Sequence, residues 1–125
     1  MGLTVITLTE VAAYTGPHAL PGIRFRALRQ ALGVTAFGLN LLELDPGCES
    51  YPEHDHLAVM KDGQEEVYLV LEGSVVLQAE GTERVLAAGD AVRVPPDVTR
   101  KLVTRGEGAT VLALGATPGR AYAPT

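Results

Sequence analysis

The sequence predicts an all-β fold, a barrel of two antiparallel sheets that forms a single domain over residues 1–125. Two observations support this fold class. Short apolar runs recur along the chain at intervals of about 8–12 residues, and its 14 glycines and 8 prolines separate these runs instead of gathering in one linker. Only Glu10–Tyr14 and Ala27–Leu32 have a helical pattern, and each is too short to be stable as an isolated helix. Many short strands with regular turns are typical of a barrel or a sandwich.

The apolar runs give the expected strands and the breaks between them give the expected turns. Tight reversals are expected at Glu72-Gly73 and Glu80-Gly81, because glycine supplies the positive φ that hairpin turns use. In chain order, the expected strands are Leu3–Leu8, Ile23–Leu28, Val34–Leu44, Glu65–Leu71, Ser74–Ala79, Glu83–Ala87, Ala91–Val94, Thr99–Thr104 and Ala109–Leu114.

The run Glu65–Leu71 is apolar on both faces. Side chains alternate with period two along a strand, so Glu66, Tyr68 and Val70 share one face with Gln64. Val67, Leu69 and Leu71 occupy the other face. A barrel interior buries only one face of the strand, so the other face must be covered by another sheet or another subunit.

Composition excludes several classes of protein. Apolar residues make up 46% of the chain and charged residues 20%, which is ordinary for a folded domain and argues against disorder. The net charge of −5 and the lack of a Lys/Arg cluster argue against nucleic-acid binding. No segment reaches the roughly 20 apolar residues that span a bilayer, and no signal peptide is evident. With a single cysteine, Cys48, we expect a cytoplasmic protein without disulfides.

Two stretches resemble the two motifs of the cupin superfamily. The first, about residues 47–73, contains His54-x-His56 and then Glu66, with six residues between Glu66 and Gly73 as that motif requires. The second, about residues 89–104, has Gly89 followed after five residues by Pro95. The resemblance implies a double-stranded β-helix, or jelly roll, with the N-terminal strands in residues 1–44.

The chain departs from the cupin pattern at several positions. Six residues separate Gly47 from His54, where the motif has five, and nine separate His56 from Glu66, where it has three or four. In metal-binding cupins the two histidines, the glutamate and a later histidine are the usual ligands. Here the position of the later histidine is occupied by Arg100.

The residues His54, His56 and Glu66 also suggest a metal site on chemical grounds. A His-x-His pair on an extended segment directs both imidazoles to one face, and one added carboxylate completes a two-histidine, one-carboxylate set for a divalent ion. Such a site would hold Zn, Mn, Fe or Ni. The alternative is a polar loop with two solvated imidazoles.

Arg100 allows two interpretations if it points inward, as we expect. Its guanidinium stays charged, repels a divalent ion, and can pair with Glu66 in place of the metal. It can equally bind an anionic substrate. Gln64 and Tyr68 share the face of Glu66 and are candidate substrate-binding residues beside Arg100; otherwise they pack or cap strand ends.

Two functions from different classes follow. One is a metal-dependent enzyme of dioxygenase, isomerase, decarboxylase or lyase type that acts on a small anionic substrate, with no catalytic residue yet identified. The other is a metal-free, non-catalytic ligand-binding or sensor module in which Glu66 pairs with Arg100. We also expect a homodimer, because the runs Val67–Leu71 and Ala109–Leu114 are apolar on both faces and exposed apolar patches usually mark contacts.

Overall fold

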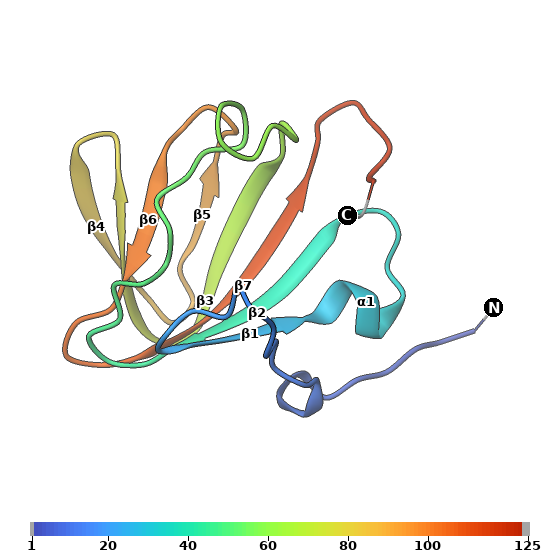
Figure 1. Ribbon diagram of the computed structural model, residues 1–125, viewed down its shortest axis with the longest axis horizontal. Coiled ribbons are helices and arrows are strands. Elements are labelled where there is room, and N and C mark those ends of the chain that lie inside the picture. Colours follow the sequence, from blue (N-terminus) through green and yellow to red (C-terminus); the bar gives the residue numbers. More distant parts are fainter. Residues whose placement is uncertain (1, 124–125) are drawn as a thin grey trace.

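The computed structural model describes residues 2–123, and the all-β prediction is confirmed there (Figure 1). Helix is limited to the three-residue 3-10 turn η1 (Leu8–Glu10) and the five-residue α1 (Leu28–Leu32). The strands are β1 (Ile23–Ala27), β2 (Gly38–Leu44), β3 (Glu65–Ala79), β4 (Thr82–Ala87), β5 (Ala91–Val94), β6 (Arg100–Val103) and β7 (Ala109–Ala116).

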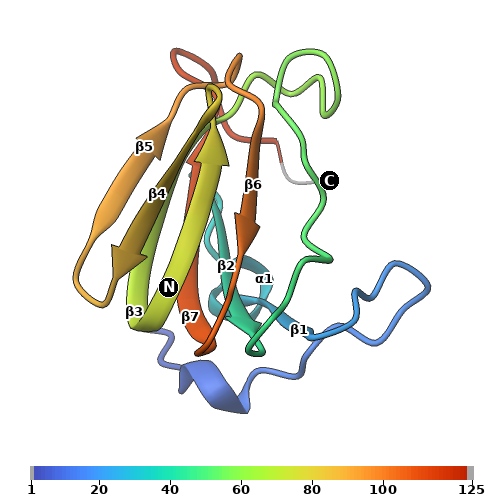
Figure 2. The same cartoon turned by 90° about the vertical axis from the view of Figure 1, so that its left-hand side faces the viewer.

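The strands form two antiparallel sheets that share β3. Sheet A has the order β1-β2-β7-β3-β5, and sheet B has the order β4-β3-β6. The first part of β3 pairs with β7 and β5, and its second part pairs with β4 and β6. Seen from the side, the two sheets curve around one interior (Figure 2).

The strand β3 runs through the position where the sequence suggests a turn. The expected reversal at Glu72-Gly73 is wrong: β3 continues across it with a register shift between Val70 and Glu72. Gly73 has φ of 70°, and a Cβ there would collide with the carbonyl oxygen of Gly108. Gly73 therefore allows a β-bulge, and at this bulge β3 leaves sheet A and enters sheet B. The second expected reversal is confirmed, with positive φ at both Glu80 and Gly81.

The barrel interior is filled mainly by aliphatic side chains. Leu102, Val75, Val70 and Val111 are fully buried. They belong to one cluster that also includes Leu77, Val94 and Ala113. Each such side chain contributes roughly 1.5–3 kcal/mol when it leaves water, so burial of this cluster stabilises the scaffold.

The N-terminal region differs most from the expectation. Leu3–Leu8 is not a strand, and Glu10–Tyr14 is not a helix; the 3-10 turn lies at Leu8–Glu10, and Ala13 forms a single bridge with Arg26. Residues 3–7 form no regular secondary structure and find no neighbouring strand among the described residues. The third expectation, a helical turn at Ala27–Leu32, corresponds to α1. No helix within residues 2–123 is long and apolar enough to cross a membrane.

Candidate metal centre

The segment that carries both candidate histidines is fixed against the start of β6. His54 and Arg100 exchange two backbone hydrogen bonds, of 3.0 and 2.8 Å, in an isolated bridge. The backbone N–H of His56 donates to the carbonyl of Pro96 at 2.8 Å. Because these bonds hold an extended backbone, both imidazoles are directed into the same end of the barrel.

The Nδ1 atom of each histidine has a hydrogen-bond acceptor as its partner. His54 Nδ1 lies 2.9 Å from the carbonyl oxygen of Pro52, and His56 Nδ1 lies 2.7 Å from Oδ1 of Asp62. A carbonyl and a carboxylate accept hydrogen bonds, so each Nδ1 carries a proton and donates. The same arrangement leaves each Nε2 as the atom available to a metal ion.

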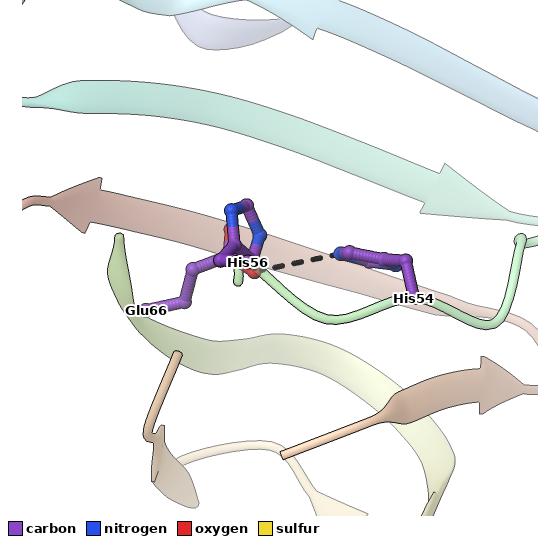
Figure 3. Close-up of side chains that lie close together, drawn as sticks. All are labelled: His54, His56 and Glu66. Atoms are coloured by element: carbon purple, nitrogen blue, oxygen red, sulfur yellow. Dashed lines mark hydrogen bonds and ion pairs between the residues drawn. The ribbon is translucent and has the colours of Figure 1, made fainter. Parts of the chain in front are cut away.

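The two Nε2 atoms converge on Glu66, which projects from β3 (Figure 3). Candidate ligand atoms of His54, His56 and Glu66 all lie within 4.8 Å of one another. Glu66 Oε1 is 2.9 Å from His56 Nε2 and 3.8 Å from His54 Nε2. The side chains are 12%, 6% and 14% exposed for His54, His56 and Glu66, so the cluster is nearly buried yet reachable from solvent.

Arg100 points into the same cluster, as expected, and is fully buried. Its Nη2 lies 3.2 Å from Glu66 Oε1, and its Nη1 donates to the carbonyl of Val98 at 2.8 Å. The Nη2 contact is close enough for an ion pair but not aligned as a hydrogen bond. Among the described residues, Arg100 Nε and Nη2 have no hydrogen-bond acceptor, and unsatisfied buried donors of this kind are rare in folded proteins.

Two tyrosines extend the cluster into the barrel. Tyr68, beside Glu66 on the inner face of β3, donates its hydroxyl to Glu66 Oε1 at 3.0 Å. The hydroxyl of Tyr51 lies 3.0 Å from that of Tyr68. Burial, together with the negative charge of Glu66, raises the pKa of Tyr51 and of Tyr68. Both phenols therefore stay protonated and act as donors.

Glu66 is the shared acceptor of the cluster. Burial alone would raise its pKa, but interactions with His54, His56 and Tyr68 outweigh burial and hold the pKa well below its usual range. The opposite shift occurs at His56, where hydrogen bonds to Glu66 and Asp62 outweigh burial and raise the pKa. Glu66 is thus a carboxylate, and His56 holds a proton that a metal ion would have to displace.

The other residues indicated by the sequence lie near this cluster in different ways. Gln64 lies over Gly115, where a Cβ would come within 2.8 Å of its Oε1 and 3.4 Å of Glu66 Cγ. Gln64 makes no side-chain hydrogen bond to the cluster among the described contacts.

Sequence reasoning missed two residues of the cluster, Asp62 and Tyr51. Asp62 lies in the loop that is longer than in the cupin pattern, and its place six residues after His56 was the available signal.

The donor set fits a divalent ion in ligand type and direction. Two neutral-nitrogen donors and one carboxylate form the combination that non-haem iron, zinc and manganese accept, and Asp62 supports His56 as carboxylates commonly support metal-bound histidines. Arg100 stands beside this set with a fixed positive charge. The residues of the cluster could therefore hold an ion, and Arg100 Nε and Nη2, which lack a hydrogen-bond acceptor among the described residues, could donate to an anion next to it.

Comparison with known proteins gives one family. The family model described as a cupin domain matches residues 40–115, more than half of the chain. Comparison with curated proteins gives no match.

Solved structures of the same fold include three informative neighbours. A sugar phosphate isomerase from a cupin superfamily, from Silicibacter pomeroyi, has 30% identity and a TM-score of 0.74, covering 91% of this chain and 76% of its own. The polyketide cyclase RemF from Streptomyces resistomycificus has 20% identity and a TM-score of 0.75, covering 99% and 88%. A cupin 2 conserved barrel domain protein from Salinispora arenicola has 22% identity and a TM-score of 0.73, covering 94% and 92%.

Proposed function

The chain belongs to the cupin family, and from this premise we propose that it is a divalent-metal-dependent enzyme acting on a small anionic substrate. His54, His56 and Glu66 would hold the ion. The observation that carries the proposal is the pairing of both Nδ1 atoms with acceptors, while both Nε2 atoms face one carboxylate. Solvated loop histidines have no reason to share this orientation.

Charge counting supports an anionic substrate. Without an ion, the two carboxylates of Glu66 and Asp62 are balanced by Arg100 and the protonated ring of His56. With a divalent ion and neutral His56, positive charge exceeds negative charge by one. An anion that approaches Arg100 restores the balance, and Nε and Nη2, which have no hydrogen-bond acceptor among the described residues, offer it donors in a weakly solvated site.

The residues of the chain can be given separate tasks in this proposal. A bound ion would polarise a substrate oxygen, as a Lewis acid does. Arg100 orients the anionic group. The hydroxyl of Tyr68, which is itself paired with that of Tyr51, holds Glu66 in place through Oε1. Among anionic substrates, sugar phosphates come first for testing, because the Silicibacter pomeroyi relative is described as a sugar phosphate isomerase.

The test begins with metal binding by protein purified without a histidine tag. Calorimetric titration with Zn, Mn, Fe(II) and Ni should give one ion per chain. His54→Ala and His56→Ala should each weaken binding at least about 100-fold, the upper end of the loss caused by removing a mere supporting group. His18→Ala is the matched control, because His18 lies in an exposed loop and should leave the affinity unchanged. Metal-loaded protein is then assayed for interconversion of sugar phosphates by phosphorus NMR.

A second candidate function has its own observation. The 3.2 Å approach of Arg100 Nη2 to Glu66 Oε1 resembles an ion pair that takes the place of a metal, and it favours a metal-free module that binds a small ligand. The two proposals separate at the first step of the test. If no ion binds at any concentration and the histidine variants behave like the parent, the enzyme proposal fails and the metal-free module stands.

A further inference from the structure

The barrel has an open seam between β4 and β5. Both strands pair with β3, β5 along its first part and β4 along its second part, and within the described residues β4 and β5 do not pair with each other. The turn at residues 88–90 joins them at one end, seen at the lower left of Figure 2. A cavity of about 100 Å³ lies in this seam, and we call it the seam pocket.

The floor of the seam pocket is made of side chains that face the barrel interior. Val92 and Val94 stand directly opposite Tyr68 and Glu66 of β3 and therefore share their inward face. Leu77 and Val94 are 5% and 2% exposed. The apolar lining residues are Leu77, Ala79, Val92, Val94, Pro95 and Val98. An apolar cavity of roughly 150 Å³ can hold benzene, so this smaller one suits a branched alkyl group of about four carbons.

The rim of the seam pocket carries one cation and one anion that the chain does not pair. Arg84 stands opposite Leu77 on the same face, so its side chain starts over the pocket. Glu80 lies at the tip of the hairpin between β3 and β4, with φ of 53°. Both are exposed, and neither forms an ion pair or a side-chain hydrogen bond among the described residues. Arg93, also on the rim, is already neutralised by Glu65 at 2.9 Å.

We propose that the seam pocket binds a free amino acid with a small branched aliphatic side chain, in its zwitterionic form. The cavity receives the aliphatic group, Arg84 pairs with the carboxylate, and Glu80 pairs with the ammonium group. A simple carboxylate would bring a second negative charge to Glu80, and a simple amine would bring a second positive charge to Arg84. A ligand with both charges complements a rim whose net charge is zero.

The seam pocket is separate from the candidate metal centre. None of its lining residues belongs to the set His54, His56 and Glu66, so the proposal does not depend on the proposed function. The test can therefore use the parent protein without added metal.

The test is an NMR titration of the parent protein with single amino acids. Exposed ion pairs contribute little, so we expect dissociation constants of about 1 mM. Leucine and valine should bind at least about tenfold more tightly than glycine, because they bury several methyl and methylene groups. Phenylalanine, whose ring exceeds the cavity, should bind more weakly than leucine. Methyl signals of Val92 and Val94 should shift, and those of Leu41, buried on β2 outside the pocket, should not.

The two rim charges are tested with ligands and with variants. Isocaproate, which lacks the ammonium group of leucine, and isoamylamine, which lacks its carboxylate, should both bind more weakly than leucine. Arg84→Gln and Glu80→Gln should each weaken leucine binding about twofold to fivefold. Because both side chains are exposed, these variants should keep the fold. Arg24→Gln is the matched control, since Arg24 is a half-exposed arginine on β1, and it should leave the affinity unchanged.

Three results would overturn the proposal. Equal binding of leucine and isocaproate, with Glu80→Gln as tight as the parent, would assign the seam pocket to simple carboxylates. Absence of any shift at the Val92 and Val94 methyls would show that the pocket does not receive the side chain. An equal loss of affinity in Arg24→Gln and Arg84→Gln would show that binding does not depend on the rim.

Discussion

The two halves of β3 bury different kinds of side chain. In the half that belongs to sheet A, the inward residues include Glu66 and Tyr68; in the half that belongs to sheet B, they include Val75 and Leu77. Side chains alternate between the two faces in both halves, but the inward positions are even-numbered before the register shift and odd-numbered after it. The first half must find a partner for every polar atom it buries, whereas the second half needs only shape and volume.

This difference teaches how one strand can serve both stability and a site. The apolar half makes many weak contacts, so the loss of one side chain removes only a limited share of its packing energy. The polar half depends on one atom: Glu66 Oε1 lies within 3.2 Å of groups on His56, Tyr68 and Arg100. A change at Glu66 therefore affects several buried groups together.

The largest effect is expected for Glu66→Gln. It removes the negative charge beside fully buried Arg100, and leaving one member of a buried pair without its partner costs about 3–5 kcal/mol. Denaturant unfolding measures this loss, and metal titration should show binding abolished. Glu65→Gln is the matched control, because the exposed pair of Glu65 and Arg93 is expected to contribute no more than about 1 kcal/mol. Similar losses of unfolding free energy in the two variants would contradict the expected difference between the buried and the exposed ion pair.

Leu77→Ala tests the apolar half. Leu77 is 5% exposed in the core cluster, and truncation of a buried leucine to alanine costs about 2–5 kcal/mol through lost burial and a cavity. The free energy of unfolding should fall by this amount while the metal affinity of the folded protein stays constant. A matching fall in metal affinity would mean that the two halves are not separable.

Asp62→Asn should have a smaller effect that is confined to the site. The carboxylate accepts a hydrogen bond from His56 Nδ1 at 2.7 Å, and loss of a group that supports a metal-bound histidine typically weakens binding about 10–100-fold. Calorimetric titration checks this value. Asp97→Asn, an exposed change at a turn, is the control, and an unchanged affinity in Asp62→Asn would remove Asp62 from the site.

Much of the fold could be predicted from local patterns in the sequence. Alternation placed Glu66 and Tyr68 on the inner face of β3, and the glycine at Gly81 marked a true hairpin. Gly73 was misinterpreted because a glycine in a turn and a glycine in a bulge both need positive φ. Only the approach of Gly108 from a distant part of the chain distinguishes them.

Residues 3–7 were predicted as part of a strand because their side chains suit one, but a strand also needs a neighbour. The sequence does not say whether that neighbour lies in the same chain.

In the site, His54, His56 and Glu66 were found by their spacing, because the motif is defined by the spacing of its ligand residues. Asp62 and Tyr51 were missed because their roles depend on contacts that no local spacing encodes: a carboxylate folded back onto His56 and a hydroxyl paired with Tyr68.

Metal binding should depend on pH in a direction set by His56. Burial disfavours the charged ring, but hydrogen bonds to Glu66 and Asp62 raise its pKa above the usual 6.5. A divalent ion must displace the Nε2 proton, so below the raised pKa the affinity should fall by up to about tenfold for each pH unit. Above that pKa it should level off. Titrations across neutral pH measure the profile, and Asp62→Asn should move the plateau to lower pH. A profile that is flat or inverted would exclude His56 as a ligand.

Arg100→His addresses the charge that distinguishes the polar half of this barrel from the usual cupin metal site. Arg100 is fully buried with Nη2 3.2 Å from Glu66 Oε1, so its charge acts where screening by water is weak. At an effective dielectric constant near 20, a positive charge a few ångströms from a divalent ion opposes binding by several kcal/mol. Histidine removes that charge at neutral pH and supplies a fourth ligand, which is the third nitrogen donor.

We expect the variant to bind Zn(II) or Mn(II) at least about tenfold more tightly than the parent, equivalent to ~1.4 kcal/mol. Calorimetric titration of both proteins at the same pH measures the difference. Arg93→His is the control, because Arg93 lies on β5 with its side chain 62% exposed, and it should leave the affinity unchanged. The fold should persist, since the aliphatic cluster around Leu77 and Leu102 is not altered. Equal affinities in the parent and Arg100→His would mean that the buried guanidinium does not restrain metal binding.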